Sequence, residues 1–285
     1  MENLVRLKIK SIYNDLSNKE QTIADYILEN PFKFSHSAIS NISTELNVAD
    51  STIFQFAKKL GYNGFKDLKL AILVQENDLS AISLHVHENI TKDDNELMMA
   101  QKVFDSTISS LEDTRSLLKL EDLKLATNLI SNSNRLFLFG VGGSQITASD
   151  AYHKFLRASI SVHHHPDYHI QLMEASLINS DDCALFISHT GRSKETKKLA
   201  ETAKKNGAKI IVITSQENSP LAKLADIVLL SMAEETAFRS EALSSRISQL
   251  CIIDSLYVIY MFFHRETSQN SLSKVRATIV DTKEN

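Results

Sequence analysis

The chain has 285 residues, 43% of them hydrophobic and 23% charged, which is typical of a soluble globular protein long enough for two domains. The net charge of −4 gives no overall case for nucleic-acid binding, so such a function would have to rest on local features. The two cysteines, Cys183 and Cys251, lie in apolar runs and exclude a disulfide framework, and the charged start of the chain argues against a secretory signal, so we expect a cytoplasmic protein.

Residues 1–77 carry helical patterns only, and we expect an all-α domain there. Ser17 and Glu20 are spaced as a capping box, which predicts the start of a helix. Asn30-Pro31 predicts the end of that helix, because the residue before a proline disfavours the helical conformation.

Two further helices are predicted over Ile39–Leu46 and Ser51–Leu60, with a four-residue break at Asn47–Asp50 between them. This spacing is typical of a helix-turn-helix, whose second helix enters the major groove of DNA. The apolar residues Ile53 and Phe56 are expected to face the core. The opposite face of the second helix is then free to contact DNA.

That opposite face is polar and partly basic. Ser51 and Thr52 lie at the helix N-terminus, the part of a recognition helix that reaches base edges, and Gln55 follows one turn later. The lysines placed to neutralise phosphates are Lys58, Lys59, Lys66 and Lys69. Because residues 1–77 hold equal numbers of basic and acidic side chains, a helical bundle with a solvated polar face is the alternative interpretation.

The rest of the chain divides by composition. Two polar and mostly acidic runs, Gln75–Asp78 and Thr91–Glu96, mark a shift in composition, and we expect a linker over residues 78–95. Residues 96–131 return to an amphipathic helical pattern that leads into a second domain over residues 132–268. Residues 269–285 are expected to form a polar tail.

The second domain alternates short apolar runs with helical segments, which predicts an α/β fold with a parallel sheet covered on both faces. The expected strands are Leu136–Phe139, Ile160–His163, Ala184–Ile187, Lys209–Thr214 and Ile227–Leu230. The expected helices are Ser144–Leu156, Ile170–Leu177, Ser193–Asn206, Pro220–Ala225 and Glu241–His264. Within the last helix the run Cys251–Phe263 is interrupted by Asp254 and too short to span a membrane, so we expect it to be buried and no membrane contact to form.

Polar loops follow two of the expected strands. The loop Gly140-Val141-Gly142-Gly143-Ser144 comes after the first strand, and Ser188-His189-Thr190-Gly191-Arg192-Ser193-Lys194-Glu195-Thr196 comes after the third. Hydroxyl groups and the unpaired N–H groups of a helix start bind phosphate without a metal. One such loop is more readily explained as a helix cap, but two at one edge of a parallel sheet predict a site for a small phosphorylated molecule.

These motifs resemble a known family. The run Asp50–Tyr62, followed by Gly64-Phe65, resembles the helix-turn-helix of the RpiR-type bacterial transcription regulators. The two polar loops resemble the phosphosugar loops of their sugar isomerase (SIS) domain, which has a Rossmann-like α/β sandwich fold. The stretch Ala233–Ser240 with Ser245-Arg246-Ile247 resembles the segment before the last helix of that domain.

The resemblance implies a regulator of carbohydrate metabolism genes that binds operator DNA with its N-terminal domain and a phosphorylated sugar effector with its SIS domain. Five residues match the phosphate-binding positions of the family, namely Ser144, Ser188, His189, Thr190 and Ser193. Gly143, His169 and Glu235 complete the set of candidate sugar-phosphate contacts. Two positions depart from the family pattern: Gln55 stands where arginine is usual, and Thr190 stands where serine is usual but keeps the hydroxyl.

The histidines of the second domain invite a metal hypothesis, which the sequence does not favour. Adjacent side chains of His163-His164-His165 point to opposite faces of a strand and cannot converge on one ion. No cysteine or carboxylate pair flanks them at ligand spacing. We therefore expect neither a metal nor a cofactor, and we expect His169, at the ligand edge of the sheet, to hydrogen-bond a sugar hydroxyl.

An enzymatic function is the alternative. Glu174, Glu235 and Glu241 are candidate acid–base groups, because aldose–ketose isomerisation needs a carboxylate that moves a proton. They could equally orient sugar hydroxyls or pair with Arg239 and Arg246. With a helix-turn-helix attached we predict that the chain is not an enzyme, and a phosphosugar isomerase or related SIS-domain enzyme is the rival reading. Because such operators are usually palindromic, we also expect a homodimer or homotetramer.

Overall fold

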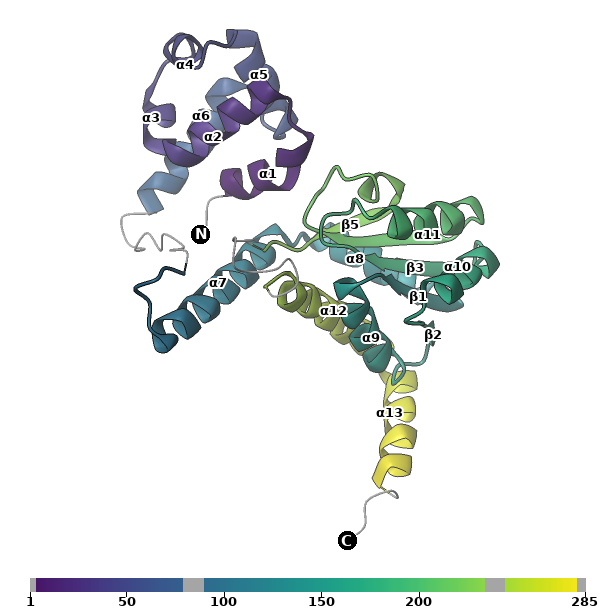
Figure 1. Cartoon of the computed structure of the whole chain (residues 1–285). Helices are drawn as coiled ribbons and strands as arrows, with labels where there is room; N and C mark the ends of the chain where they lie inside the picture. Colours follow the sequence, from purple (N-terminus) through teal and green to yellow (C-terminus); the bar gives the residue numbers. More distant parts are fainter. Residues whose placement is uncertain (1–3, 79–89, 234–243, 281–285) are drawn as a thin grey trace. The chain divides into compact units, whose positions relative to one another are not determined.

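The computed structural model describes residues 4–78, 90–233 and 244–280, and divides the chain into two compact units, Met1–Lys102 and Val103–Asn285 (Figure 1). The boundary falls within helix α7, Glu96–Leu117, so the chain passes from one unit to the other inside a helix.

The first unit is entirely helical over its described residues. Its helices before α7 are α1 (Leu4–Ile12), α2 (Asn18–Glu29), α3 (Pro31–His36), α4 (Ile39–Glu45), α5 (Asp50–Lys59) and α6 (Phe65–Asp78). The expected all-α fold is therefore confirmed. Phe34, Ile42, Ile53 and Phe56 are fully buried in one core, so the apolar stripes read from the sequence are the faces that pack together.

The expected boundaries of the helices hold with small shifts. The backbone N–H of Ser17 donates to the Glu20 carboxylate at 2.7 Å, which confirms the capping box. Helix α2 ends at Glu29, as Asn30-Pro31 predicted, but Pro31 also begins the short helix α3. This helix was not predicted, although proline is favoured at the first position of a helix because its missing N–H is not needed there.

Helices α4 and α5 form the expected helix-turn-helix. The turn contains Asn47, whose positive φ of 51° lies in the left-handed region that asparagine tolerates better than most side chains. The N–H of Val48 donates to the carbonyl of Ser43 at 2.9 Å, which closes the end of α4. Helix α5 begins at Asp50, one residue earlier than the sequence predicted.

The second unit contains a five-stranded, all-parallel sheet of order β2-β1-β3-β4-β5. The strands are β1 (Arg135–Gly140), β2 (Ser161–His163), β3 (Asp182–Ile187), β4 (Lys209–Thr214) and β5 (Ile227–Leu230). The five expected strands and the parallel α/β fold are confirmed. Strands β1, β3 and β4 are buried almost throughout, as in a sheet covered on both faces.

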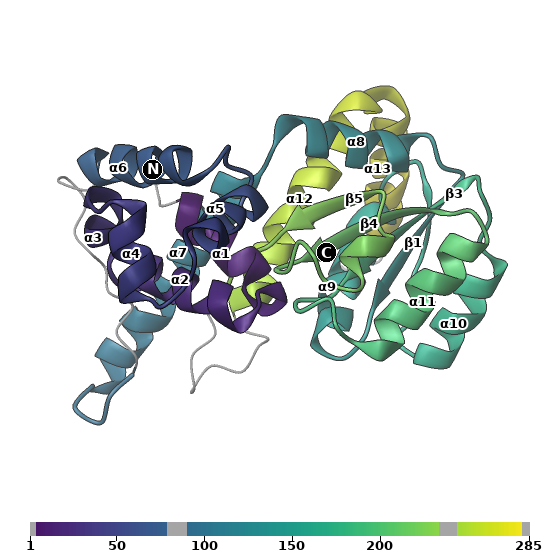
Figure 2. The ribbon, with the colours of Figure 1, turned by 90° about the horizontal axis from the view of Figure 1, so that it is seen from above.

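Helices cover both faces of this sheet, and Figure 2 shows α10 and α11 together on one side of it. The helices of this unit after α7 are α8 (Leu120–Ser131), α9 (Gly143–Phe155), α10 (Tyr168–Leu177), α11 (Lys194–Lys205), α12 (Ser244–Phe263) and α13 (Arg265–Val280). Helices α8, α9 and α12 share a core with one face of the sheet, and α10 and α11 share a core with the other.

Two expected elements are corrected. The segment Pro220–Ala225 is a single 3₁₀ turn at Ala222–Leu224, because Ala225 is already extended and the N–H of Asp226 donates to the carbonyl of Ile210 beside β5. The polar segment 269–285 is not only a tail, since α13 continues to Val280. Its composition is polar, but it lacks the glycine and proline that would end a helix.

Helix α12 is buried on one side only, which corrects the expectation of a buried helix. Ile253 and Leu256 are fully buried, whereas Val258, Phe262 and Phe263 are 62%, 70% and 72% exposed. By length and composition its segment 245–263 could cross a membrane, and it is the one described helix of which this is true. Core helices of soluble proteins meet the same criteria, and α12 packs on α8 and α9.

Candidate ligand-binding and DNA-binding sites

The two polar loops of the second unit begin side by side. In the sheet register Gly140, the last residue of β1, pairs with Ile187, the last residue of β3. The strand order 2-1-3-4-5 reverses direction between these two strands, and in open α/β sheets this switch point, at the carboxyl ends of the strands, is where ligands bind. The topology therefore places both loops where a ligand site is expected.

A cavity of about 200 Å³ lies at this point. Its lining is Val141, Gly143, Ser144, Ser188, His189, Thr190, Ser245, Arg246 and Gln249. Five of the eight candidate sugar-phosphate residues therefore line one cavity, namely Gly143, Ser144, Ser188, His189 and Thr190. The sequence analysis did not assign the three residues that α12 contributes. Ser245 and Arg246 lay in a stretch with family resemblance, but Gln249 gave no signal, because a lone polar residue in an apolar helix has no recognisable pattern.

The first loop leaves the start of helix α9 open toward the cavity. Gly142 precedes the helix with a φ of +62° and has no side chain that could cap it. A Cβ on Gly140 would lie 2.6 Å from the carbonyl oxygen of Ser144, so only glycine lets the strand end approach the helix this closely. Gly143 and Ser144 line the cavity, so the positive end of the α9 dipole lies in its wall.

The second loop is held rigidly by strand β4. The carbonyl of His189 accepts hydrogen bonds from the Thr214 hydroxyl at 2.8 Å and from the Ser215 hydroxyl at 2.9 Å. The N–H of Ser188 donates to the carbonyl of Ile213 at 3.0 Å. These bonds hold the backbone of Ser188 and His189 in place without a ligand, which lowers the ordering cost of binding.

Two candidate residues, Ser193 and His169, do not join the cavity wall, and a third is not described. The Ser193 hydroxyl accepts from the N–H of Thr196 at 3.2 Å and caps helix α11, which is the alternative role that the sequence left open for these hydroxyls. His169 is exposed and its ring contacts that of Tyr168. Glu235 lies outside the described residues, as do Glu241 and Arg239.

The three adjacent histidines each have a partner of their own. The ring of His163 stacks on Phe137, His164 bonds to the Leu138 carbonyl through Nδ1 and the Ser149 hydroxyl through Nε2, and His165 accepts from the Asp167 N–H. Burial lowers the pKa of His164, against the hydrogen bond to the Leu138 carbonyl, which favours a neutral ring. Within residues 4–78, 90–233 and 244–280, no group of three or more histidine, cysteine, aspartate or glutamate side chains could hold a metal ion.

Glu174, a candidate acid–base group, lies on α10 and does not line the cavity. Burial raises the pKa of its carboxyl, while His165 opposes the shift, and one of its oxygens is buried without a hydrogen-bond partner among the described residues. A raised pKa suits a proton-transfer group, but this carboxyl is not part of the wall that a ligand at the switch point would touch.

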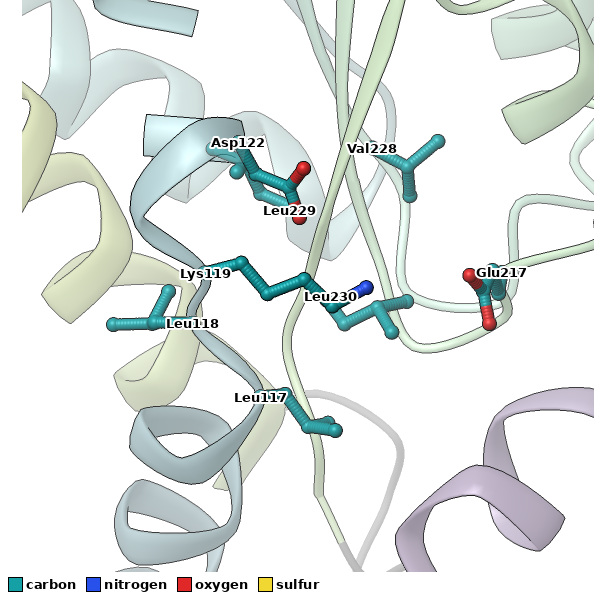
Figure 3. Close-up of a pocket in the computed structure, with 8 residues that line it drawn as sticks. All are labelled: Leu117, Leu118, Lys119, Asp122, Glu217, Val228, Leu229 and Leu230. Carbon is teal, nitrogen blue, oxygen red and sulfur yellow. The ribbon is translucent and has the colours of Figure 1, made fainter. Parts of the chain in front are cut away.

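A second cavity, of about 30 Å³, is too small for a sugar phosphate (Figure 3). It lies between the α7–α8 connection and strand β5, with Lys119 and Asp122 on one side and Glu217 on the other. A space of this size holds a water molecule or two. It carries no evidence for a ligand.

The helix-turn-helix presents most of the expected DNA-binding face. Ser51, Gln55 and Lys58 are exposed on α5, and Thr52 is half-buried. The Lys58 ammonium lies 5.9 Å from the ring centre of Phe54, which is itself 40% exposed. These side chains form one polar surface with an apolar edge.

Lys59 is already engaged within its own unit. Its ammonium lies 3.1 Å from a Glu20 carboxylate oxygen and donates to the carbonyl of Asp15 at the same distance. A lysine with two internal acceptors is less available to a DNA phosphate than one that extends into solvent. The two lysines therefore differ in their availability to DNA, although the sequence predicted the same role for both.

A helix-turn-helix unit followed by a parallel α/β unit with a cavity at its switch point is the arrangement of a DNA-binding regulator with a second, α/β domain. The model of the helix-turn-helix domain of the rpiR family matches residues 3–78, and that of the SIS domain matches residues 129–259. An uncharacterized HTH-type transcriptional regulator from Haemophilus influenzae is 31% identical over 278 residues, which cover 96% of both chains. The HTH-type transcriptional regulator RpiR of Escherichia coli K12 is 31% identical over 264 residues, which cover 93% of this chain and 88% of the relative.

The chain belongs to the RpiR family of HTH-type transcriptional regulators, as its motifs predicted, and its second unit has the SIS fold. The NanR protein of Vibrio vulnificus, solved in complex with ManNAc-6P, matches the full length of both chains with a TM-score of 0.62. At 23% identity this likeness concerns the fold.

Proposed function

We propose that this regulator binds an operator through helices α4 and α5 and that a sugar phosphate in the cavity at the β1–β3 switch point controls that binding. The observation that carries the proposal is the convergence of the uncapped start of α9 with the Ser144, Ser188 and Thr190 hydroxyls on one cavity. Hydroxyl and backbone N–H donors at a helix start are complementary to a phosphate. The similar fold of NanR, whose structure holds ManNAc-6P, supports a phosphorylated sugar as the ligand class.

The proposed phosphate contacts are Gly143, Ser144, Ser188, His189 and Thr190. Arg246 joins them from α12, because it lines the cavity and an arginine fits phosphate oxygens with two parallel hydrogen bonds. Ser193 acts through the cap of α11 and not through the ligand. The proposed role of His169, as a contact to a sugar hydroxyl, requires a sugar that extends beyond the cavity wall, and that of Glu235 stays a prediction.

For DNA, we propose that Ser51, Thr52 and Gln55 contact base edges and that Lys58 contacts a phosphate. The support is their position on the exposed face of α5, at the N-terminal end that a recognition helix presents to the major groove. Lys59 is proposed to stabilise the fold of the unit through Glu20.

The proposed active form is a homodimer or homotetramer in the cytoplasm, where the operator lies. A palindromic operator needs two recognition helices related by symmetry. The exposed apolar residues at the end of α12, Val258, Phe262 and Phe263, form a surface that a second copy of the chain would cover. The proposed domain limits remain 1–77 and 132–268, joined by the linker 78–95 and the helical segment 96–131.

We also propose that the chain is not an enzyme. The relatives are named as transcriptional regulators, and Glu174 is outside the cavity wall. The rival function, a phosphosugar isomerase, predicts turnover of an aldose phosphate to a ketose phosphate by the purified chain. The proposal predicts no turnover together with ligand-dependent binding to DNA.

The direct test is a gel shift with the DNA upstream of the chain's own gene, titrated with a panel of sugar phosphates. We expect at least one of them to change the DNA affinity of the wild-type chain, and Ser188→Ala to abolish that response while DNA binding without ligand is kept. DNA binding that no sugar phosphate alters would contradict the proposal.

A further inference from the structure

Gln249 of α12 has an unusual place in the cavity. Gln249 is only 2% exposed, yet it contributes to the cavity lining. The hydroxyl of Thr147, a fully buried residue of α9, donates to its Oε1 atom at 3.4 Å. Its Nε2 atom is buried and has no hydrogen-bond partner within the part of the chain that the structure describes.

A buried amide with an unused donor is unfavourable in the free protein. Buried polar groups of native proteins nearly always have a partner, and an exception points to a strained, functional or ligand-dependent group. The bond from Thr147 holds the Oε1 end of the amide on α9. Because Gln249 also lines the cavity, a ligand bound there is a candidate for the missing partner of Nε2.

The position of this donor relative to α9 indicates which part of a ligand it meets. Thr147 comes four residues after Gly143, so the Thr147–Gln249 pair lies about 6 Å along the helix axis from the start of α9. Phosphate oxygens are expected at that start, where the free N–H groups and the Ser144 hydroxyl are. A group about 6 Å away along α9 is too far from that start to contact the phosphate itself and is within reach of the sugar part of the ligand.

We propose that Gln249 is a specificity-determining residue of the effector site, whose Nε2 atom donates a hydrogen bond to an oxygen of the sugar part of the ligand. This inference rests on the proposed function, because it assumes that a sugar phosphate occupies the cavity. An unsubstituted amide N–H selects an acceptor, so the preferred ligands carry a carbonyl, ring or hydroxyl oxygen at this position. A sugar phosphate with an apolar or cationic group there binds more weakly, since it gains no hydrogen bond from Nε2.

The experiment compares two probes on the full-length chain by calorimetry and thermal melting. One probe is inorganic phosphate, which tests the phosphate contacts alone. The other is whichever member of a panel binds the wild-type chain most tightly; the panel is ManNAc-6P, glucose 6-phosphate, fructose 6-phosphate and glucosamine 6-phosphate. The variants are Gln249→Leu, Gln249→Met as a second unbranched replacement, and Ser188→Ala as the control for the phosphate contacts.

We expect Gln249→Leu and Gln249→Met to weaken the sugar phosphate about tenfold, the effect of one lost hydrogen bond in a buried site, and to leave inorganic phosphate within about twofold. Ser188→Ala is expected to weaken both probes. Without ligand the two Gln249 variants should melt close to the wild-type temperature, because removal of the unpaired Nε2 group offsets the loss of the long hydrogen bond from Thr147.

Two results would overturn the inference. Sugar-phosphate affinity equal to that of the wild-type chain in both Gln249 variants, with Ser188→Ala still impaired, would show that Nε2 does not meet the ligand. A lower melting temperature in both variants together with unchanged affinity would assign Gln249 a structural role. A wild-type chain that binds no member of the panel would instead contradict the proposed function, and the role of Gln249 would fall with it.

Discussion

Lys59 of α5 lies 3.1 Å from Glu20, the carboxylate that closes the capping box of α2. The same carboxylate accepts hydrogen bonds from the backbone N–H and the hydroxyl of Ser17 at 2.7 and 2.8 Å. Burial alone would raise the pKa of Glu20, but the Ser17 and Lys59 hydrogen bonds outweigh it, and the pKa lies below its usual value. The recognition helix is therefore fastened to the N-terminus of α2 by the lysine that sequence alone assigns to DNA.

This pairing predicts different effects for two neighbouring lysines. Lys58→Ala should weaken binding to all DNA sequences and lower the slope of log affinity against log salt by about one unit, because one phosphate contact is lost. Lys59→Ala should leave the slope unchanged and lower the stability by about 1 kcal/mol, as expected for a partly exposed ion pair. Salt titrations of DNA binding, with urea unfolding of both variants, separate the two roles. A reduced slope for Lys59→Ala at unchanged stability would reverse the assignment.

Gln55 stands where the family usually has arginine, and its side chain is exposed one turn into α5. We predict that the side-chain amide of Gln55 forms hydrogen bonds with the N6 and N7 atoms of an adenine. Gln55→Ala should then reduce discrimination at one base pair by about 1–3 kcal/mol. Competition binding against an operator library measures this loss. An equal weakening for every sequence would mean that Gln55 contacts the DNA backbone.

Two serines of the second loop should respond in opposite ways. Ser188→Ala removes a hydroxyl from the cavity wall and is expected to cost about 1.5–3 kcal/mol of sugar-phosphate affinity, as for a hydrogen bond to a charged group. Ser193→Ala removes the cap of α11 and should cost about 1 kcal/mol of stability while the affinity stays close to that of the wild type. Calorimetry and denaturant unfolding of each variant are the measurements. If Ser193→Ala lost affinity as Ser188→Ala does, the hydroxyl would bind the ligand as well as the helix.

The sheet contains an ion pair whose effect depends on pH. The Arg135 guanidinium donates to both carboxylate oxygens of Asp182, at 2.9 and 2.6 Å, and the N–H of Asn179 donates to the second oxygen at 2.9 Å. Burial would raise the pKa of Asp182, but these hydrogen bonds outweigh it and the pKa lies below its usual value. A lowered carboxyl pKa stabilises the fold above the pKa of the unfolded chain, and this stabilisation is lost as the pH falls through the folded value.

Arg135→Met should therefore destabilise the second unit by up to about 3 kcal/mol at pH 7, because the buried Asp182 carboxylate loses its cation while Arg135 itself is a third exposed. The difference from the wild type should shrink as the pH falls below about 4, where the unfolded carboxyl is protonated. Unfolding curves between pH 7 and pH 3 test this. A difference that stays constant over that range would mean that Arg135 acts through packing.

The sequence predicted the elements with clear periodic patterns and the residues on strand ends. Strands β1 and β3 and the loops behind them follow from short apolar runs and hydroxyl clusters, and these alone indicated Ser144 and Ser188. The sequence left the Ser193 hydroxyl two roles, as a helix cap or as a ligand contact, and only the structure shows the cap. The contact of Lys59 could not be predicted, because its acceptors Glu20 and Asp15 are supplied by a distant part of the chain. Gln249 was missed for the same reason, since only the packing of α12 on α9 brings it to the cavity.

The α12 helix also offers a route from the ligand to the helix that crosses the boundary between the two units. The hydroxyl of Ser248, next to Gln249, donates to the carbonyl of Ser110 in α7 at 3.3 Å. Ser248→Ala is predicted to leave sugar-phosphate affinity without DNA unchanged and to reduce the effect of the ligand on DNA binding. Gel shifts with and without ligand measure that effect. A full ligand response in Ser248→Ala would exclude this bond from the coupling.

The central claim is that the cavity in the SIS fold and the helix-turn-helix are energetically linked, and reciprocity gives the most direct test. Calorimetry measures the affinity of the full-length chain for its sugar phosphate, first alone and then saturated with operator DNA. The account predicts two affinities that differ by about 5- to 150-fold, the usual range of allosteric coupling, and the ligand should change operator affinity by the same factor. Equal ligand affinity with and without bound operator would contradict the sensor function.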